Sequence, residues 1–139
     1  MSFFSLFSLK MSALVFATSE ERQVMRDDLQ THFNSTKVRH DEFGCILWQG
    51  VKDGSYPTRK VVIGGRKITV RSHQVSYFVF TDDSYRGLDF HVSHLCHRKN
   101  CLNRDHLTQE HCSINHERSN CNKAKVCSGH PGHGPCILH

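Results

Sequence analysis

This sequence of 139 residues has no long hydrophobic run and only a modest share of charged residues. The apolar stretch near the start, residues 3–7, is broken by Ser5 and followed by Lys10, whereas a membrane-spanning helix needs about 20 apolar residues. Charged residues make up only 22% of the chain and apolar residues 37%. These totals fit neither a disordered chain nor a membrane protein, and the length suits one domain with one core.

The first 17 residues also lack the pattern of a signal peptide. They are apolar, but they have no basic segment at the start and Lys10 interrupts them. We therefore expect a flexible N-terminal extension over residues 1–17 and a single domain over residues 18–139. Seven cysteines would leave one thiol unpaired after three disulfides. That count favours a reduced, intracellular setting, and we expect a nuclear protein.

Cysteine and histidine are the residues that the sequence has in unusual amounts. Seven Cys and twelve His make up 19 of the 139 residues, and most of them follow residue 90. Such a concentration is typical of metal-ligand chemistry. Eighteen Lys and Arg against thirteen Asp and Glu give a formal net charge of +5. This mild basic excess is compatible with a nucleic-acid partner but does not establish one.

An amphipathic helix is predicted over residues 19–33. Thr18 and Glu21 have the spacing of a capping box at its start. Apolar side chains follow at every fourth position, at Met25, Leu29 and Phe33. A short apolar run bounded by glycines comes next, over residues 43–48, and it predicts a strand that carries Cys45 inward.

A β-hairpin is predicted after this strand. Residues 59–63 and 66–71 flank Gly64-Gly65, which is a two-residue turn signal. Alternation along the two strands puts the apolar side chains on faces that should be buried, at Val61, Ile63, Ile68 and Val70.

A second helix is predicted directly after the hairpin. Ser72 is expected to cap it, and it should run to about Phe80. Its inward side chains would be those of Val75, Phe78 and Val79. Residues 81–89 are rich in Asp and Gly and predict a loop.

The other face of the hairpin is basic. Residues 52–71 contain six Lys and Arg against a single Asp, so the net charge of this segment equals the net charge of the whole chain. A two-stranded ribbon with this charge fits the major groove of DNA. The candidate DNA contacts are Lys60, Arg66, Lys67, Thr69 and Arg71. The alternative is a solvated strand face whose charges discourage aggregation.

A first zinc site is predicted from the spacing of three ligands. Four residues separate Cys96 from Cys101, and four separate Cys101 from His106. Cys45, the one cysteine before residue 96, is the natural fourth ligand. A Cys3His site of this kind is closed and structural. The alternative is a core thiol with a histidine nearby by chance.

A second zinc site is predicted from the last 20 residues. Its ligands would be Cys121, Cys127, His130 and Cys136. Glycines and prolines lie between them, so this segment has almost no core-forming side chains and needs an ion to organise it. Three thiols fit a disulfide poorly. Spacing does not decide between His130 and His133, and Cys112 remains as a buried free thiol.

These motifs together give the chain a resemblance to a known family. The matching text is Ser93-His94-Leu95-Cys96-His97, followed by Cys101, Asn103, His106-Leu107, Asn115, and the Cys/His loop from Cys121 to Cys136. Upstream, Pro57-Thr58-Arg59 and His73-Gln74-Val75 also match. Over about residues 43–136 the chain resembles the His-Cys box homing endonucleases, a branch of the ββα-metal (His-Me finger) nucleases. The resemblance implies a small, irregular α+β fold of the ββα-metal type, with an antiparallel sheet and two structural zinc sites.

The resemblance also implies a catalytic site for phosphodiester hydrolysis. His94 matches the family's general base, which takes the proton from the attacking water. Asn115 matches the residue that holds a single catalytic Mg²⁺ through its amide oxygen, on a helix that we expect Ser113 to cap. Arg59 matches the arginine that stabilises charge at the scissile phosphate.

Alternatives remain open for two of these roles. His91 and His97 compete with His94 as the base. An asparagine near a helix start, such as Asn115, is often a cap.

Two functional interpretations follow. The first is a Mg²⁺-dependent, sequence-specific endonuclease that cuts double-stranded DNA and carries two structural zincs. The second is a non-catalytic, zinc-stabilised DNA-binding module on the same scaffold. Members of this family are two-fold dimers that use a C-terminal tail, whereas only three residues follow Cys136. We therefore expect a homodimer that is formed through another surface or is weak.

Overall fold

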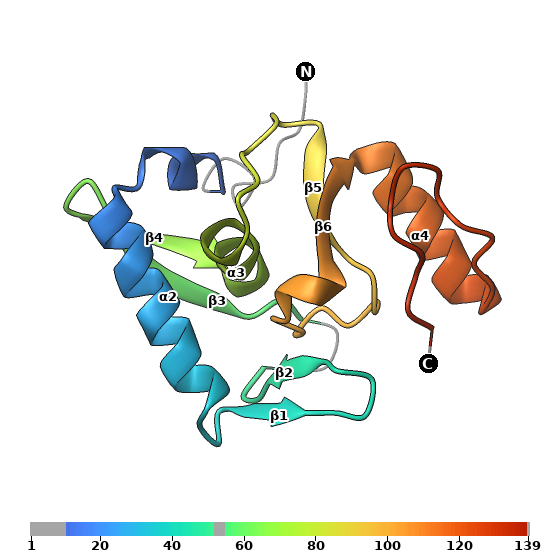
Figure 1. Cartoon of the computed structure of the whole chain (residues 1–139), viewed down its shortest axis with the longest axis horizontal. Helices are drawn as coiled ribbons and strands as arrows, with labels where there is room; N and C mark the ends of the chain where they lie inside the picture. Colours follow the sequence, from blue (N-terminus) through green and yellow to red (C-terminus); the bar gives the residue numbers. More distant parts are fainter. Residues whose placement is uncertain (1–10, 52–54, 139) are drawn as a thin grey trace.

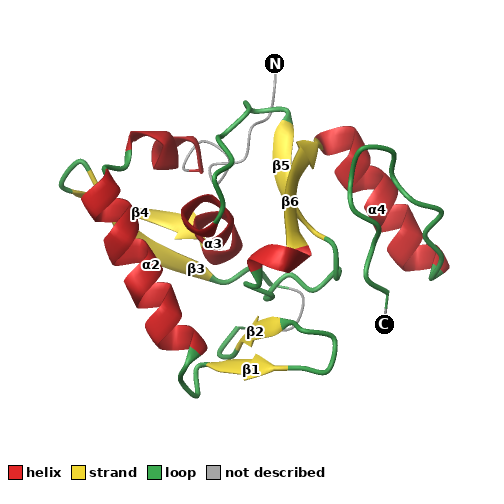
Figure 2. Cartoon of the chain, in the orientation of Figure 1, coloured by secondary structure: helices red, strands yellow, loops and turns green. Residues whose placement is uncertain are grey.

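The computed structural model of the chain describes residues 11–51 and 55–138. Within them, helices pack among three separate two-stranded antiparallel sheets (Figures 1 and 2). In chain order the elements are η1 (Ala13–Phe16), α2 (Ser19–Phe33), β1 (Val38–His40), β2 (Ile46–Trp48), β3 (Thr58–Ile63), β4 (Arg66–Arg71), α3 (Ser72–Phe80), β5 (Phe90–His94), η2 (Arg104–His106), β6 (Leu107–His111) and α4 (Cys112–Ala124). The small α+β fold is as predicted, although the antiparallel strands form three pairs rather than one sheet. Among the described helices, none combines the length and the apolar character needed to cross a membrane.

The N-terminal segment packs onto the core. Met11 and Leu14 are only 1% and 2% exposed, and the Arg22 guanidinium of α2 donates a 3.0 Å hydrogen bond to the Leu14 carbonyl. Within the flexible extension expected over residues 1–17, the Met11 and Leu14 side chains thus bury against the domain, whereas those of Val15 and Phe16 are exposed. Residues 1–10, which include the apolar stretch at residues 3–7, lie outside the described residues.

Helix α2 begins and ends where the sequence predicts. The Thr18 hydroxyl accepts a hydrogen bond from the Glu21 amide, and the Glu21 carboxylate accepts one from the Thr18 amide, so the capping box is confirmed. Met25 and Leu29 are buried. The Glu21 carboxylate also accepts a 2.9 Å hydrogen bond from the Gly64 amide. The cap of α2 thus contacts the turn of the β3–β4 hairpin.

The β3–β4 hairpin has the predicted two-residue turn. Ile63 pairs with Arg66 across it, and Gly64 and Gly65 have φ values of 61° and 80°, which a type I′ turn requires. Of the four side chains predicted to be buried, Ile68 is half-buried and the other three are buried, namely Val61, Ile63 and Val70.

Helix α3 occupies the centre of the fold, in contact with α2, β4, β5 and β6 (Figure 1). All side chains from Ser72 to Val79 are buried, as predicted for Val75, Phe78 and Val79, and residues 81–89 form a loop. The prediction that Ser72 caps this helix is wrong. Arg71 is the extended N-cap residue, and no side chain makes a cap hydrogen bond there.

Strands β5 and β6 and helix α4 form a ββα unit at the other side of α3 (Figure 2). Register pairs His94 with Leu107 at one end of the two strands and Phe90 with His111 at the other. Ser113 does not cap α4, contrary to prediction. His111 is the N-cap residue, and its Nδ1 accepts a 3.2 Å hydrogen bond from the Ser113 amide.

Candidate metal centres and active site

The first predicted zinc tetrad is assembled from three segments of the chain. Cys45 precedes β2, Cys96 and Cys101 lie in the loop after β5, and His106 ends η2. The four side chains are buried, and their ligand atoms all lie within 4.8 Å of one another. A backbone hydrogen bond of 2.8 Å from Leu102 to Ile46 holds this loop against β2. The tetrad therefore joins the N-terminal half of the fold to the ββα unit.

The donor atoms of this tetrad have the separations of a tetrahedral zinc site. Zn–S and Zn–N bonds at tetrahedral angles put a sulfur and a nitrogen about 3.6 Å apart. His106 Nδ1 lies 3.5 Å from the Cys45 sulfur and 3.7 Å from the Cys101 sulfur. A hydrogen bond from the Cys96 thiol, together with backbone hydrogen bonds from Asn103 and Ile46, lowers the pKa of Cys101 to about 6. Such donors favour the thiolate form that zinc requires.

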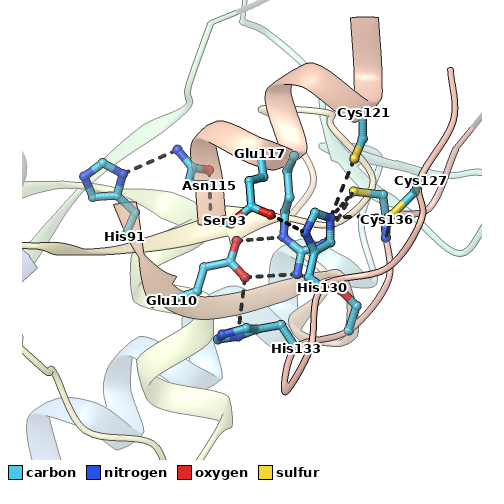
Figure 3. A network of polar contacts seen from close by, with 12 residues as sticks. His91, Ser93, Glu110, Asn115, Glu117, Cys121, Cys127, His130, His133 and Cys136 are labelled. Atoms are coloured by element: carbon cyan, nitrogen blue, oxygen red, sulfur yellow. Dashed lines mark hydrogen bonds and ion pairs between the residues drawn. The ribbon is translucent and has the colours of Figure 1, made fainter. Parts of the chain in front are cut away.

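The second tetrad closes around the Nε2 atom of His130 (Figure 3). The sulfurs of Cys121, Cys127 and Cys136 lie 3.7, 3.5 and 3.6 Å from it, which again matches the edges of a zinc tetrahedron. The backbone amide of Cys136 lowers the pKa of Cys127 to about 6. The residues thus fit a second zinc ion, and His130 rather than His133 joins the three sulfurs.

The side chains next to His130 tie the second tetrad to α4 and β6. His130 Nδ1 lies 3.6 Å from a Glu117 carboxylate oxygen, as is common for histidines that ligate zinc. His133 instead lies 3.7 Å from Glu110 (Figure 3). The Arg118 guanidinium donates a 2.7 Å hydrogen bond to the Gly134 carbonyl. Cys112 belongs to neither tetrad, and it is half-buried rather than buried as predicted.

A cavity of about 630 Å³ lies beside the ββα unit. It is lined by His94 from the end of β5 and by Asn115 from the first turns of α4. Other polar side chains that line it include those of Tyr56, Arg71, His73, His91, Ser93 and Lys99, together with the acidic side chain of Asp89. The structure therefore brings two of the three predicted catalytic residues to one cavity. His97, like His91, also lines this cavity, so both competing histidines lie near His94.

His94 is held in one tautomer. Its Nε2 lies 3.0 Å from the Cys101 carbonyl oxygen. A carbonyl only accepts hydrogen bonds, so Nε2 carries the proton and Nδ1 is the basic nitrogen. Burial lowers the pKa of His94 to about 4. The imidazole is consequently neutral at physiological pH and able to accept a proton.

Asn115 is oriented by two side chains of β5 (Figure 3). The Ser93 hydroxyl donates a 2.9 Å hydrogen bond to its Oδ1, and its Nδ2 lies 3.4 Å from His91 Nδ1. An amide oxygen has two lone pairs, so Oδ1 keeps one for a further partner. An amide oxygen is also a suitable ligand for a hard cation such as Mg²⁺.

A comparison with family models gives a match that covers most of the chain. The model for the zinc-binding loop region of homing endonuclease matches residues 19–134. The chain belongs to this homing endonuclease family. Comparisons with curated proteins and with solved structures gave no match. Family membership confirms the predicted resemblance, and together with the two tetrads it supports bound zinc and a nuclease.

Arg59, the third predicted catalytic residue, lies apart from the cavity that His94 and Asn115 line. Arg59 pairs with Val70 on the face toward the core. Its guanidinium donates a 2.8 Å hydrogen bond to Asp28 and lies 3.1 Å from His32 Nδ1. Burial lowers its pKa from the usual value. Arg59 is not among the described residues that line the His94 cavity. Its predicted role at the scissile phosphate would require that the ion pair with Asp28 opens.

The predicted DNA contacts divide between the two faces of the same hairpin. Register pairs Lys60 with Thr69 and Thr58 with Arg71, and cross-strand partners share a face. Lys60, Lys67, Thr69 and Arg71 therefore lie on one face, and Arg71 brings that face to the cavity. Arg66 pairs with Ile63 and belongs to the other face.

Three cavity residues were missed by sequence reasoning as parts of a site. Tyr56 precedes β3, His73 lies in α3, and Lys99 lies in the loop of the first tetrad. His73 belongs to a motif that was recognised, and Tyr56 and Lys99 each stand next to one, but nothing in the local pattern says that the three converge. Arg71 was recognised only as a groove contact, although the two-residue turn already fixes its register opposite Thr58.

Proposed function

We propose that the protein is a Mg²⁺-dependent, sequence-specific double-stranded DNA endonuclease of the His-Cys box homing type. The observation that carries the proposal is the placement of His94 and Asn115 on one cavity, with His94 held in the tautomer that a general base needs. The family match supports the nuclease class. The proposed cleavage reaction and the proposed DNA target go beyond that match. The cavity supports the reaction, and the hairpin supports the target.

His94 would act on the attacking water. Its Nδ1 takes the proton while the Cys101 carbonyl holds Nε2 and keeps the ring in place. Asn115 Oδ1, oriented by Ser93, would hold Mg²⁺. When bound, the cation supplies Lewis-acid stabilisation of charge on the phosphate and water ligands for the leaving oxygen.

The exposed face of the β3–β4 hairpin would hold the DNA. Lys60, Lys67 and Thr69 lie along this face, and Arg71 at its end lines the His94 cavity. A duplex whose groove receives the ribbon would thus have its backbone near His94. This continuity between a basic face and the cavity supports double-stranded DNA as substrate. The two zinc ions would be structural, because each tetrad uses all four ligand positions.

A homodimer would supply the second active site that a double-strand cut needs. Light scattering of the protein with and without DNA measures whether it is a monomer or a dimer. The proposed nuclear location follows from the proposed DNA substrate. Imaging of the tagged chain in cells tests it.

Nicking of supercoiled plasmid is the experiment that tests the proposed function. We expect the zinc-loaded protein to convert supercoiled plasmid to nicked and linear forms with Mg²⁺ and not without it. Deep sequencing of the cut ends would show a preferred site. Tight DNA binding with no nicking at any Mg²⁺ concentration would instead identify a zinc-stabilised DNA-binding module.

A further inference from the structure

The guanidinium of Arg118 reaches a sulfur of the second tetrad. Arg118 lies in α4 and is 1% exposed, and its Nη1 atom donates a 3.5 Å hydrogen bond to the Sγ atom of Cys136. Arginine keeps its proton in proteins, so this contact brings a positive charge to a metal ligand. Hydrogen bonds with a charged partner are roughly twice as strong as neutral ones.

The other nitrogens of this guanidinium fix its orientation. Nε and Nη2 donate to the two carboxylate oxygens of Glu110 in β6. Nη2 also donates to the carbonyl of Gly134, in the same loop as Cys136. A planar guanidinium that is held along one edge presents its remaining nitrogen in one direction. Contacts with β6 and with the ligand's own loop therefore aim Nη1 at the Cys136 sulfur.

The second tetrad carries a negative charge that this arginine offsets. Three thiolates around one Zn²⁺ ion leave a net negative charge on the centre. The Glu117 carboxylate adds to it, 3.6 Å from His130 Nδ1 (Figure 3). A cation beside a ligand sulfur therefore stabilises the zinc-loaded site.

The second tetrad also has less packing around it than the first. Its three cysteines are half-buried, whereas those of the first tetrad are buried. The Cys136 amide donates a 3.4 Å hydrogen bond to the Cys127 sulfur, but this neutral donor belongs to the loop itself. Arg118 instead ties the loop to α4 and, through Glu110, to β6. The residues that hold a metal's ligands commonly set its affinity.

We propose that Arg118 sets how tightly the second tetrad holds zinc: its guanidinium, aimed by Glu110 and Gly134, donates to the Cys136 thiolate and offsets the charge of that sulfur. Arg118 is then a positioning residue of the metal site and not only the partner of Glu110. The inference concerns zinc binding and does not depend on the proposed cleavage reaction.

A chelator titration of the zinc-loaded protein tests this role one site at a time. NMR signals of the labelled His106 and His130 rings report zinc at the first and the second tetrad. Arg118→Gln should weaken zinc binding at the second tetrad by about 10- to 100-fold, the usual loss when the partner of a metal ligand is removed, and should leave the first unchanged. The matched control Arg86→Gln, which alters an arginine paired with Asp83 at the surface, should bind zinc as the wild type does.

Glu110→Gln separates this role from a merely structural one. The variant loses the buried ion pair, but the guanidinium keeps its charge beside Cys136. We expect Glu110→Gln and Arg118→Gln both to unfold at lower urea concentrations than the wild type, because each leaves a buried charge unpaired. Glu110→Gln should nevertheless hold zinc at the second tetrad at least as tightly as the wild type. Equal weakening of zinc binding in both variants would mean that the pair only braces the fold, and would overturn the proposal.

The reactivity of the Cys136 thiolate gives a second measurement. A hydrogen-bond donor stabilises a thiolate and lowers its intrinsic nucleophilicity. In the zinc-loaded Arg118→Gln protein, alkylation mapped by mass spectrometry should therefore be about threefold faster at Cys136. Cys127, which keeps its backbone donor, should react at the wild-type rate.

Arg118→Lys, which keeps a positive charge, should restore part of the zinc affinity that Arg118→Gln loses. An Arg118→Gln protein with the wild-type zinc affinity or the wild-type alkylation rates would overturn the proposal. So would a wild-type protein that holds no zinc at the second tetrad.

Discussion

The guanidinium of Arg118 and the carboxylate of Glu110 form a two-pronged ion pair inside the protein. Nε donates to one carboxylate oxygen at 2.7 Å and a terminal nitrogen donates to the other at 2.9 Å. Arg118 is 1% exposed and Glu110 is fully buried. This pair joins β6 to α4, and Arg118 also contacts Gly134 in the loop of the second tetrad.

Removing one partner of this pair should destabilise the protein severely. Arg118→Leu leaves the Glu110 carboxylate buried without its counter-charge, which costs roughly 3–5 kcal/mol of the free energy of unfolding. Urea denaturation of the zinc-loaded protein measures the loss. The double variant Arg118→Leu/Glu110→Leu should recover part of it, because no buried charge remains. Arg86→Leu, which breaks the exposed pair with Asp83, should cost less than about 1 kcal/mol. Equal costs for the two arginines would contradict the structural role of Arg118.

Zinc removal should unfold the C-terminal loop. The purified protein should carry two zinc ions per chain, one for each tetrad. Cys121→Ser should lose one ion and much of a binding free energy on the order of 10 kcal/mol. Cys112→Ser is the matched control, since Cys112 belongs to neither tetrad, and it should keep both ions. Elemental analysis with a thermal melt gives the result, and a wild-type protein with one ion or none would refute the second site.

Asn115 should control the response to magnesium. Asn115→Ala removes the amide oxygen proposed as ligand, so cleavage should fall and should recover partly as Mg²⁺ is raised. Asn120→Ala changes an exposed side chain of the same helix, outside the cavity, and should leave the Mg²⁺ dependence unchanged. Cleavage rates over a range of Mg²⁺ concentrations measure both. A uniform loss that magnesium does not repair would argue against ligation by Asn115.

DNA affinity should depend on the face of the hairpin that a charge occupies. Lys67→Ala should weaken binding and reduce the slope of log affinity against log salt by about one, the value for one phosphate contact. Arg66→Ala should change the slope less, because register puts Arg66 on the other face. Titrations at several salt concentrations measure both slopes. The reverse order would mean that DNA approaches the hairpin from its other side.

Local patterns predicted the parts of this fold that depend on near neighbours in the sequence. The capping box of α2, the Gly64-Gly65 turn and the short spacings from Cys96 to His106 and from Cys121 to Cys136 each act over a few residues, and the structure confirms all three. The wrong helix caps had a different cause. Ser72 already lies inside its helix, because the strand before it ends at Arg71 without a break.

Side chains that meet only through the tertiary fold were beyond such patterns. No sequence motif includes Arg118 or Glu110, yet both are buried, and Arg118 donates a hydrogen bond to Gly134 in the loop of the second tetrad. The family resemblance assigned Arg59 to the scissile phosphate, but α2 supplies Asp28 as its partner. No sequence motif in β3 predicts that Arg59 pairs with a carboxylate 31 positions earlier in the chain. Tyr56 and Lys99 likewise meet only after the first tetrad has placed its loop.

The cleavage rate of His94→Ala, measured with protein in excess over DNA and with Mg²⁺ present, tests the proposed mechanism most directly. Removing a general base should lower that rate by about 10² to 10⁴ and leave DNA affinity and the melting temperature nearly unchanged. The control His116→Ala alters an exposed side chain of α4 outside the cavity, and it should cut at the wild-type rate. A His94→Ala protein that also cuts at the wild-type rate would contradict the assignment of His94 as the base.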